Sequence, residues 1–325
     1  MEKKPDSCKA VGTLAGVSAE ERVGKGTAGA WVTAISLLPS GIAIAWLVSK
    51  TQWFWMHRPD LQFGWIVLML CGYLFWEAWE RKPDLCDRWT LSTLVLAAGG
   101  LGLLFVVQMY QAAFGLNSAS LAGLACGIMA LIAANLHYLF GWVGIRHFAF
   151  TFAFLLVALP MPSAIQNPLV GGLQSSVAFL NVEILRLLGI PAQQIGSVIK
   201  LPGCIVGVDE ACSGIRSLQS TIMATLFIGY LTLRRASLKI LLLLAGIGLA
   251  VIGNVGRSLF LSYTANQKGL QALEAFHDPA GWSILTFTAA GVILVTWLLN
   301  RAESAIQARP LTAPLSPSGR DNQQR

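Results

Sequence analysis

The chain of 325 residues is strongly apolar, with 55% hydrophobic and only 12% charged residues. Soluble domains carry about 25% charged residues, so this composition excludes a soluble domain, a disulfide-rich secreted module and a disordered chain. The net charge of +7 is typical of basic loops on the cytoplasmic side of a membrane protein, and we expect no nucleic-acid partner.

Eight apolar runs are long enough to cross the roughly 30 Å hydrocarbon core of a bilayer. In chain order the predicted spans are Ala28–Val48, Gln62–Trp79, Leu91–Tyr110, Ala119–Phe140, Trp142–Pro160, Ile215–Leu233, Leu238–Leu259 and Trp282–Asn300. The sequence therefore predicts an all-α, polytopic membrane helical bundle. It has an N-terminal segment (1–27), a transmembrane domain (28–300, with its catalytic part at about 150–300) and a tail (301–325).

The distribution of Lys and Arg sets the expected orientation. With both termini in the cytoplasm, sixteen basic residues face that side and seven face the other, as the positive-inside rule requires. The protein is therefore expected in the cytoplasmic (inner) membrane. A ninth span at Asn167–Leu188 would turn the basic pair Arg234-Arg235 outward, so we expect that segment to be an amphipathic helix on the outer face.

Three short polar stretches are expected to reach the outer leaflet together. They lie at 208–216, where the sixth span opens, at 253–257, where the seventh closes, and at 276–282, in the loop that opens the eighth. The middle stretch contains Arg257 near the end of an apolar helix, where a charged side chain is costly unless it is paired or functional. These stretches are the candidate site.

The residue types in these stretches are those of an acyl-transfer site. Cys212 lies at the start of a helix, where the dipole favours a thiolate, and Arg216 follows one turn later. His277 can accept and return a proton, and Arg257 can stabilise an oxyanion. Asn254 precedes Arg257 by one turn and can orient it or bind the substrate carbonyl.

The same residues have plainer interpretations. Asp209 and Glu210 can cap the sixth helix, Arg257 can reach lipid headgroups, and His277-Asp278 can form a capping turn. A disulfide between Cys204 and Cys212 is another possibility, because both are expected on the oxidising face. No spacing typical of a metal site occurs in the sequence, and we expect no cofactor.

The three stretches resemble the signature of the exosortase/archaeosortase family, which are multi-pass membrane cysteine transpeptidases. The resemblance lies in E-A-C-S-G-I-R-S-L at 210–218, in the N-x-x-R of Asn254 and Arg257, and in F-H-D-x-x-G-W at 276–282. It covers about 150–300 and implies that Cys212, Arg257 and His277 are catalytic. Supporting or substrate-binding roles are implied for Glu210, Ser213, Gly214, Arg216, Asn254 and Asp278.

The resemblance also implies the substrate. Such enzymes cleave the C-terminal sorting signal of exported proteins, a short motif (Pro-Glu-Pro-like in many relatives) followed by a hydrophobic helix and a basic cluster. The acyl group held as a thioester on Cys212 would then pass to a lipid or other amine acceptor, or to water, and the thiol would be released. Two alternatives remain open at this point: a purely hydrolytic intramembrane cysteine protease, and a non-catalytic multi-pass transporter or polysaccharide-assembly component.

Overall fold

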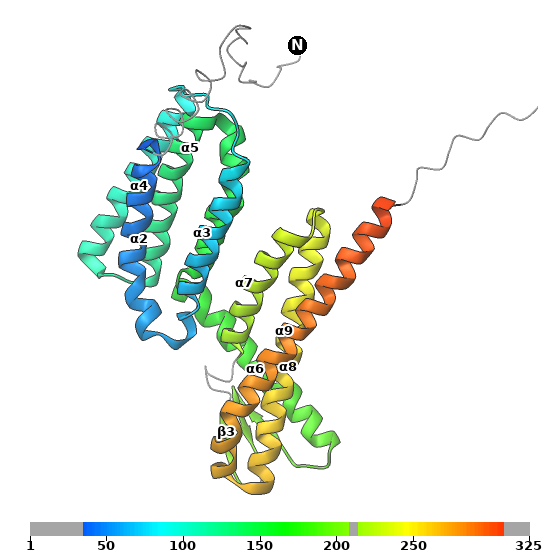
Figure 1. Ribbon diagram of the computed structural model, residues 1–325. Helices are drawn as coiled ribbons and strands as arrows, with labels where there is room; N and C mark the ends of the chain where they lie inside the picture. The colour runs from blue at the N-terminus through cyan, green and yellow to red at the C-terminus, as the bar shows by residue number, and fades with distance from the viewer. Residues whose placement is uncertain (1–34, 208–213, 309–325) are drawn as a thin grey trace, which may run out of the picture. The chain divides into compact units, whose positions relative to one another are not determined.

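The computed structural model describes residues 35–207 and 214–308 and is built almost wholly of helices (Figure 1). Within these residues, six helices are long and apolar enough to cross a membrane. The prediction of an all-α, polytopic membrane bundle is therefore confirmed. The contacts divide the chain into two compact units, 1–172 and 173–325. The α-helices are α2 (Leu38–His57), α3 (Gly64–Glu80), α4 (Leu91–Phe114), α5 (Ser118–Leu155), α6 (Ser163–Leu187), α7 (Ile215–Thr232), α8 (Ala236–Lys268) and α9 (Leu270–Ala308).

The first unit contains α2 to α5 and two short 3₁₀ turns, η1 (Pro59–Leu61) and η2 (Leu156–Ala158). Helix α2 starts ten residues later than the predicted span Ala28–Val48, with Pro39 at its start, a position that proline favours. Residues 28–34 of that span lie outside the described residues. The last turns of α2 are aromatic, and the buried Trp55 donates its indole N–H to the carbonyl of Ala158 at 2.8 Å.

Helix α5 is broken at Gly141, whose φ of 65° and ψ of −162° are not helical. Before the break, the hydroxyl of Thr93 on α4 lies 2.8 Å from Nδ1 of His137. After the break, Nε2 of His147 lies 2.7 Å from the carbonyl oxygen of Ala78 on α3. The two runs therefore pack on different neighbours, as expected of the two separate spans predicted on either side of Gly141. A glycine adopts this backbone conformation without steric cost.

The second unit contains a small antiparallel sheet that the sequence analysis did not predict. Its strands are β1 (Gln193–Ile195), β2 (Val198–Lys200) and β3 (Ile205–Gly207), in the order β1-β2-β3. A two-residue turn, Gly196-Ser197, joins the first two strands, and Gly196 has a φ of 63°. Ile199 and Val206 pack into a core cluster with residues of α6 and α8. Strand β3 ends at Gly207, the last described residue before 208–213.

Helices α8 and α9 form an antiparallel hairpin around Gly269, whose φ is 83°, and Figure 1 shows them side by side. Both helices are longer than the predicted spans Leu238–Leu259 and Trp282–Asn300. At the other end of the hairpin, the buried carboxylate of Glu303 accepts the backbone N–H groups of Arg234 at 3.0 Å and Arg235 at 2.9 Å.

The length of this hairpin corrects two expectations. Arg257 does not lie near the end of its helix, because α8 continues for eleven more residues. His277 does not lie in a loop before the last helix, because it is the eighth residue of α9. Hydropathy detects only the apolar part of a helix, whereas these polar extensions are stabilised by packing against each other. The expected placement of α6 on the outer face stays a prediction, since α6 also meets the length and hydropathy of a span.

Candidate active site

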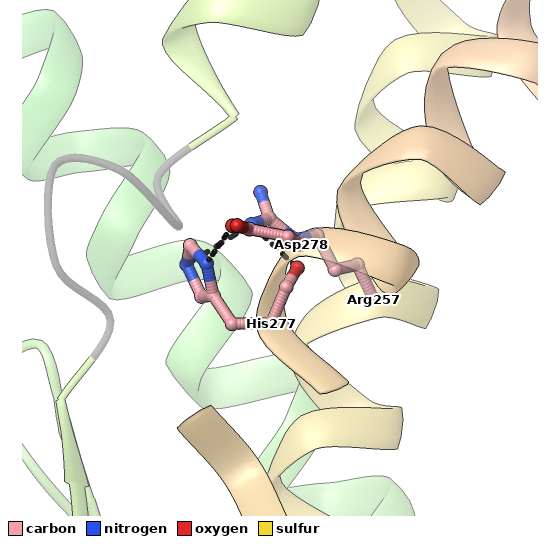
Figure 2. Close-up of polar contacts among 3 residues, drawn as sticks. All are labelled: Arg257, His277 and Asp278. Carbon is pink, nitrogen blue, oxygen red and sulfur yellow. Dashed lines mark hydrogen bonds and ion pairs between the residues drawn. The ribbon is translucent and has the colours of Figure 1, made fainter. Parts of the chain in front are cut away.

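The α8–α9 hairpin brings a guanidinium, an imidazole and a carboxylate into one hydrogen-bonded chain (Figure 2). Nη2 of Arg257 lies 3.1 Å from Nε2 of His277 and 3.4 Å from its carbonyl oxygen. Nδ1 of His277 lies 3.1 Å from Oδ1 of Asp278. The imidazole is one third exposed, whereas the Asp278 side chain is 90% exposed. Two adjacent helices thus hold Arg257 and His277 without the help of a loop.

These contacts fix the tautomer of His277. A guanidinium has only hydrogen-bond donors, so Nε2 of His277 must accept the N–H of Arg257 with its lone pair. The ring proton then lies on Nδ1, where it is donated to Asp278. The two contacts require the same neutral tautomer.

A cavity of about 310 Å³ opens in front of these side chains. It is lined from α7 and the residue before it, from α8 and from α9. The lining residues are Gly214, Arg216, Ser217, Ser220, Asn254, Arg257, His277, Asp278, Gly281, Trp282, Ile284 and Leu285. Six of the nine site residues named from the sequence therefore line one cavity, although they come from three separate stretches of the chain.

Gly214, which lines this cavity, lies very close to Asn254 of α8. Its φ of 79° is the left-handed conformation that favours glycine. A Cβ on Gly214 would lie 2.5 Å from Cγ of Asn254, whose side chain is buried. The carbonyl of Gly214 also accepts the hydroxyl of Ser217 at 2.9 Å. The start of α7 and the middle of α8 thus approach each other as closely as a glycine allows.

The remaining three predicted residues, Glu210, Cys212 and Ser213, lie outside the described residues. Cys204, considered above as a disulfide partner of Cys212, is a free cysteine. It is half-buried between β2 and β3, and burial raises the pKa of its thiol. Within the described part of the chain, no group of three His, Cys, Asp or Glu side chains could hold a metal ion.

Sequence reasoning gave no role to Ser217 or Ser220, which also line the cavity. Ser220 follows Arg216 at the i,i+4 spacing of one helical face, and this spacing would have predicted that both line the same surface. The two hydroxyl groups add hydrogen-bonding capacity to the wall that α7 contributes. Trp282 and Leu285 of α9 add apolar side chains to the lining of the same cavity.

Comparison with known proteins agrees with the resemblance noted from the sequence. The transmembrane exosortase family matches residues 55–296, about three quarters of the chain and well beyond the 150–300 covered by the motifs. No curated protein shows significant similarity to the chain. No solved structure matches it either. Members of the matching family are in general membrane cysteine transpeptidases. The chain is a multi-pass membrane protein and belongs to the transmembrane exosortase family.

Proposed function

We propose that this protein is a cysteine transpeptidase that cleaves the C-terminal sorting signal of exported proteins through a thioester on Cys212. One observation carries the proposal. The hydrogen-bonded Arg257 and His277 line a cavity whose wall also includes Gly214, and Gly214 is only two residues from Cys212 in the sequence. Two residues of chain span at most about 7 Å, so covalent geometry keeps the thiol within reach of this cavity.

The proposed reaction has two halves: formation of the thioester on Cys212, and transfer of its acyl group to an acceptor. Nε2 of His277 takes the proton of the Cys212 thiol, and the sulfur attacks the carbonyl carbon of the sorting signal. Arg257 donates hydrogen bonds to the oxyanion that forms. The C–N bond then breaks, and the proton on His277 passes to the leaving nitrogen. An acceptor amine attacks the thioester, forms a new amide bond and restores the thiol; with water as the acceptor, the product is a carboxylic acid.

The start of α7 supports the role of Cys212 as a nucleophile. Helix α7 begins at Ile215, and the first N–H groups of a helix have no partner within the helix. Together with the helix dipole, they favour negative charge at this end. Arg216 adds a positive charge to the same wall of the cavity. Both features favour a thiolate near the beginning of α7.

The proposed substrate is compatible with the membrane location of the protein. A sorting signal with its own hydrophobic helix can lie beside these spans with its motif at the outer interface. The positive-inside distribution supports a cavity on the outer face of the cytoplasmic membrane, with both termini inside. The substrates are therefore exported proteins with such a tail, and lipids or other amines are the candidate acceptors.

The test is to co-express a tailed substrate with the wild type and with single variants. Cys212→Ala and His277→Ala are expected to abolish cleavage of the tail, whereas Cys204→Ala, the matched cysteine outside the cavity, is expected to retain it. Mass spectrometry of the cleaved protein distinguishes transfer, which leaves an amine-linked adduct, from hydrolysis. Unchanged cleavage by Cys212→Ala contradicts the proposal and favours a non-catalytic role.

A further inference from the structure

The first unit contains an apolar groove that has no part in the proposed reaction. Helices α2 and α3 both pack against α5 and contact each other far less. The groove is lined by all three helices and has a volume of about 580 Å³, within the range of about 300–1,000 Å³ that is typical of ligand pockets. Ser40 and Thr151, the two residues of the lining that carry a hydroxyl group, are buried. The exposed surface of the groove is therefore almost wholly apolar.

One face of α3 forms the long wall of this groove. Its lining residues recur at i, i+3, i+4, i+7, i+8 and i+11, which is one side of a helix over three turns. They are Leu68, Cys71, Gly72, Phe75, Trp76 and Trp79. With a rise of 1.5 Å per residue, this wall is about 16 Å long. One leaflet contributes about half of the roughly 30 Å hydrocarbon core of a bilayer, so the groove has the length of one acyl chain lying in one leaflet.

Two glycines keep the groove open. Gly41 of α2 and Gly72 of α3 both line it, and a Cβ at either position would meet nothing within 4 Å in the described part of the chain. Other glycines of this unit bring helices together, as at Gly127 of α5, where a Cβ would lie 2.7 Å from Cδ2 of Leu104 on α4. The residues four positions before and after Gly72 are a leucine and a tryptophan, so α3 lacks the pair of small residues with which membrane helices pack closely. The notch at Gly72 therefore suits a flexible chain better than a second helix.

A positive charge lies at one end of the groove. Trp79 is the last residue of α3 in the lining, and Nζ of Lys82 lies 4.6 Å from the centroid of its ring. Arg81 is also exposed at this end of α3 and pairs with Glu77 at 3.0 Å. Tryptophan and basic residues at the end of an apolar helix are typical of the headgroup region of a bilayer. A phosphate at this level would meet the ammonium group of Lys82 while an acyl chain attached to it lay in the groove.

We propose that this groove binds an anionic phospholipid, with one acyl chain between α2 and α3 and the phosphate at Lys82. This binding site lies wholly within the first unit, and it does not depend on the cysteine chemistry proposed above. Arg81 and Lys82 are among the basic residues expected on the cytoplasmic side, so the lipid comes from the inner leaflet. Its acyl chain links α2 and α3, which make few contacts with each other.

The experiment titrates the full-length protein in detergent with dipalmitoyl phosphatidylglycerol and counts bound lipids by native mass spectrometry. Dipalmitoylglycerol, which has the same chains and no phosphate, is the uncharged probe. We expect the wild type to bind one phosphatidylglycerol about fivefold more tightly than dipalmitoylglycerol, because a lysine near the membrane surface attracts the anionic headgroup. Lys82→Gln should remove most of this preference. Gly72→Leu should weaken the binding of both lipids about tenfold, since its side chain takes the place of about two methylene groups.

Gly102→Leu is the matched control. Gly102 lies in α4, outside the lining, and a Cβ there would also meet nothing within 4 Å in the described residues. This variant should bind both lipids as the wild type does.

Wild-type binding by Gly72→Leu, an equal loss in Gly102→Leu, or an unchanged preference in Lys82→Gln overturns the proposal. A mass of two chains that Gly72→Leu abolishes also overturns it, because the groove then holds a second copy of the protein. If the thermal midpoint shows that Gly72→Leu is unfolded, Gly41→Leu decides, since it enters the same groove from α2 and must weaken both lipids.

Discussion

Substitution of Gly214 by alanine tests whether the close approach of α7 and α8 builds the cavity. The new Cβ would meet Asn254 at 2.5 Å from Cγ and 2.7 Å from Nδ2, distances that force the buried amide to move. The left-handed backbone costs about 1–2 kcal/mol for a residue with a Cβ, and overpacking adds about 1–3 kcal/mol. Because Asn254 precedes Arg257 by one turn of α8, we expect a displaced guanidinium and a fall in cleavage of about 100-fold.

The assay compares the cleavage rate and the thermal midpoint of Gly214→Ala with those of Gly256→Ala. Gly256 is the matched control, since it lies next to Arg257 and a Cβ there would meet nothing within 4 Å. Alanine in the interior of a helix is favoured over glycine by about 0.5–1 kcal/mol, so Gly256→Ala should be neutral or slightly stabilising. Equal activities for the two variants would refute the view that Gly214 sets the geometry of the site.

Three further outcomes are expected. Glu303→Ala leaves the N–H groups of Arg234 and Arg235, just before α8, without their acceptor. Its thermal midpoint should therefore fall further than that of Glu303→Gln, while cleavage is retained. A lower midpoint for Glu303→Gln than for Glu303→Ala would contradict this. Burial raises the pKa of the Cys204 thiol, so the folded state holds this proton more tightly than the unfolded chain. This stabilisation is complete below about pH 8.5, the pKa of an unperturbed thiol, and is lost as the pH rises through the pKa of the folded state. Above about pH 8.5, the thermal midpoint should therefore fall more steeply with pH in the wild type than in Cys204→Ala. Asp278→Ala should slow cleavage by about tenfold at most, because water can replace an acceptor that is 90% exposed. Asp278→Asn, which keeps an acceptor oxygen for His277, should lose less, and an equal loss would show that the hydrogen bond is not what matters.

Most of the spans could be predicted because lipid leaves the backbone no alternative to a helix. Inside the bilayer every N–H and C=O must be satisfied within the segment, so an apolar run and a helix have nearly the same bounds. The run Leu91–Tyr110 becomes α4, Leu91–Phe114, and the run Ile215–Leu233 becomes α7, Ile215–Thr232. Even the break at Gly141 was implied by the separation of two predicted spans.

Outside the apolar runs, hydropathy carries no information, and the predictions were wrong or missing there. The polar ends of α8 and α9 were read as loops, although residues 259–276 are mostly good helix formers. The small sheet was missed because each of its strands has three residues. A Gly-Ser turn between Ile195 and Val198 was the available signal, since such pairs close two-residue hairpins.

The sequence named six residues that line the cavity, but it could not predict how they face each other, because that depends on the register of the hairpin. Once the turn is known to lie at Gly269, residues equally distant from it face each other. Arg257, twelve residues before the turn, faces Gly281, twelve residues after it, and the two are in fact neighbours. Leu249, twenty residues before the turn, lies against Gly291, twenty-two residues after it, so the pairing shifts by two residues along the hairpin.

His277 lies one helical turn from Gly281 on the same face of α9. The guanidinium of Arg257 therefore crosses a position without a side chain and reaches the imidazole at the next turn. The contact is a property of two packed helices and does not depend on the conformation of a loop. Rigid elements hold reacting groups more precisely than loops do, so a shift of the hairpin by one residue would separate Arg257 from His277 even with every site residue still present.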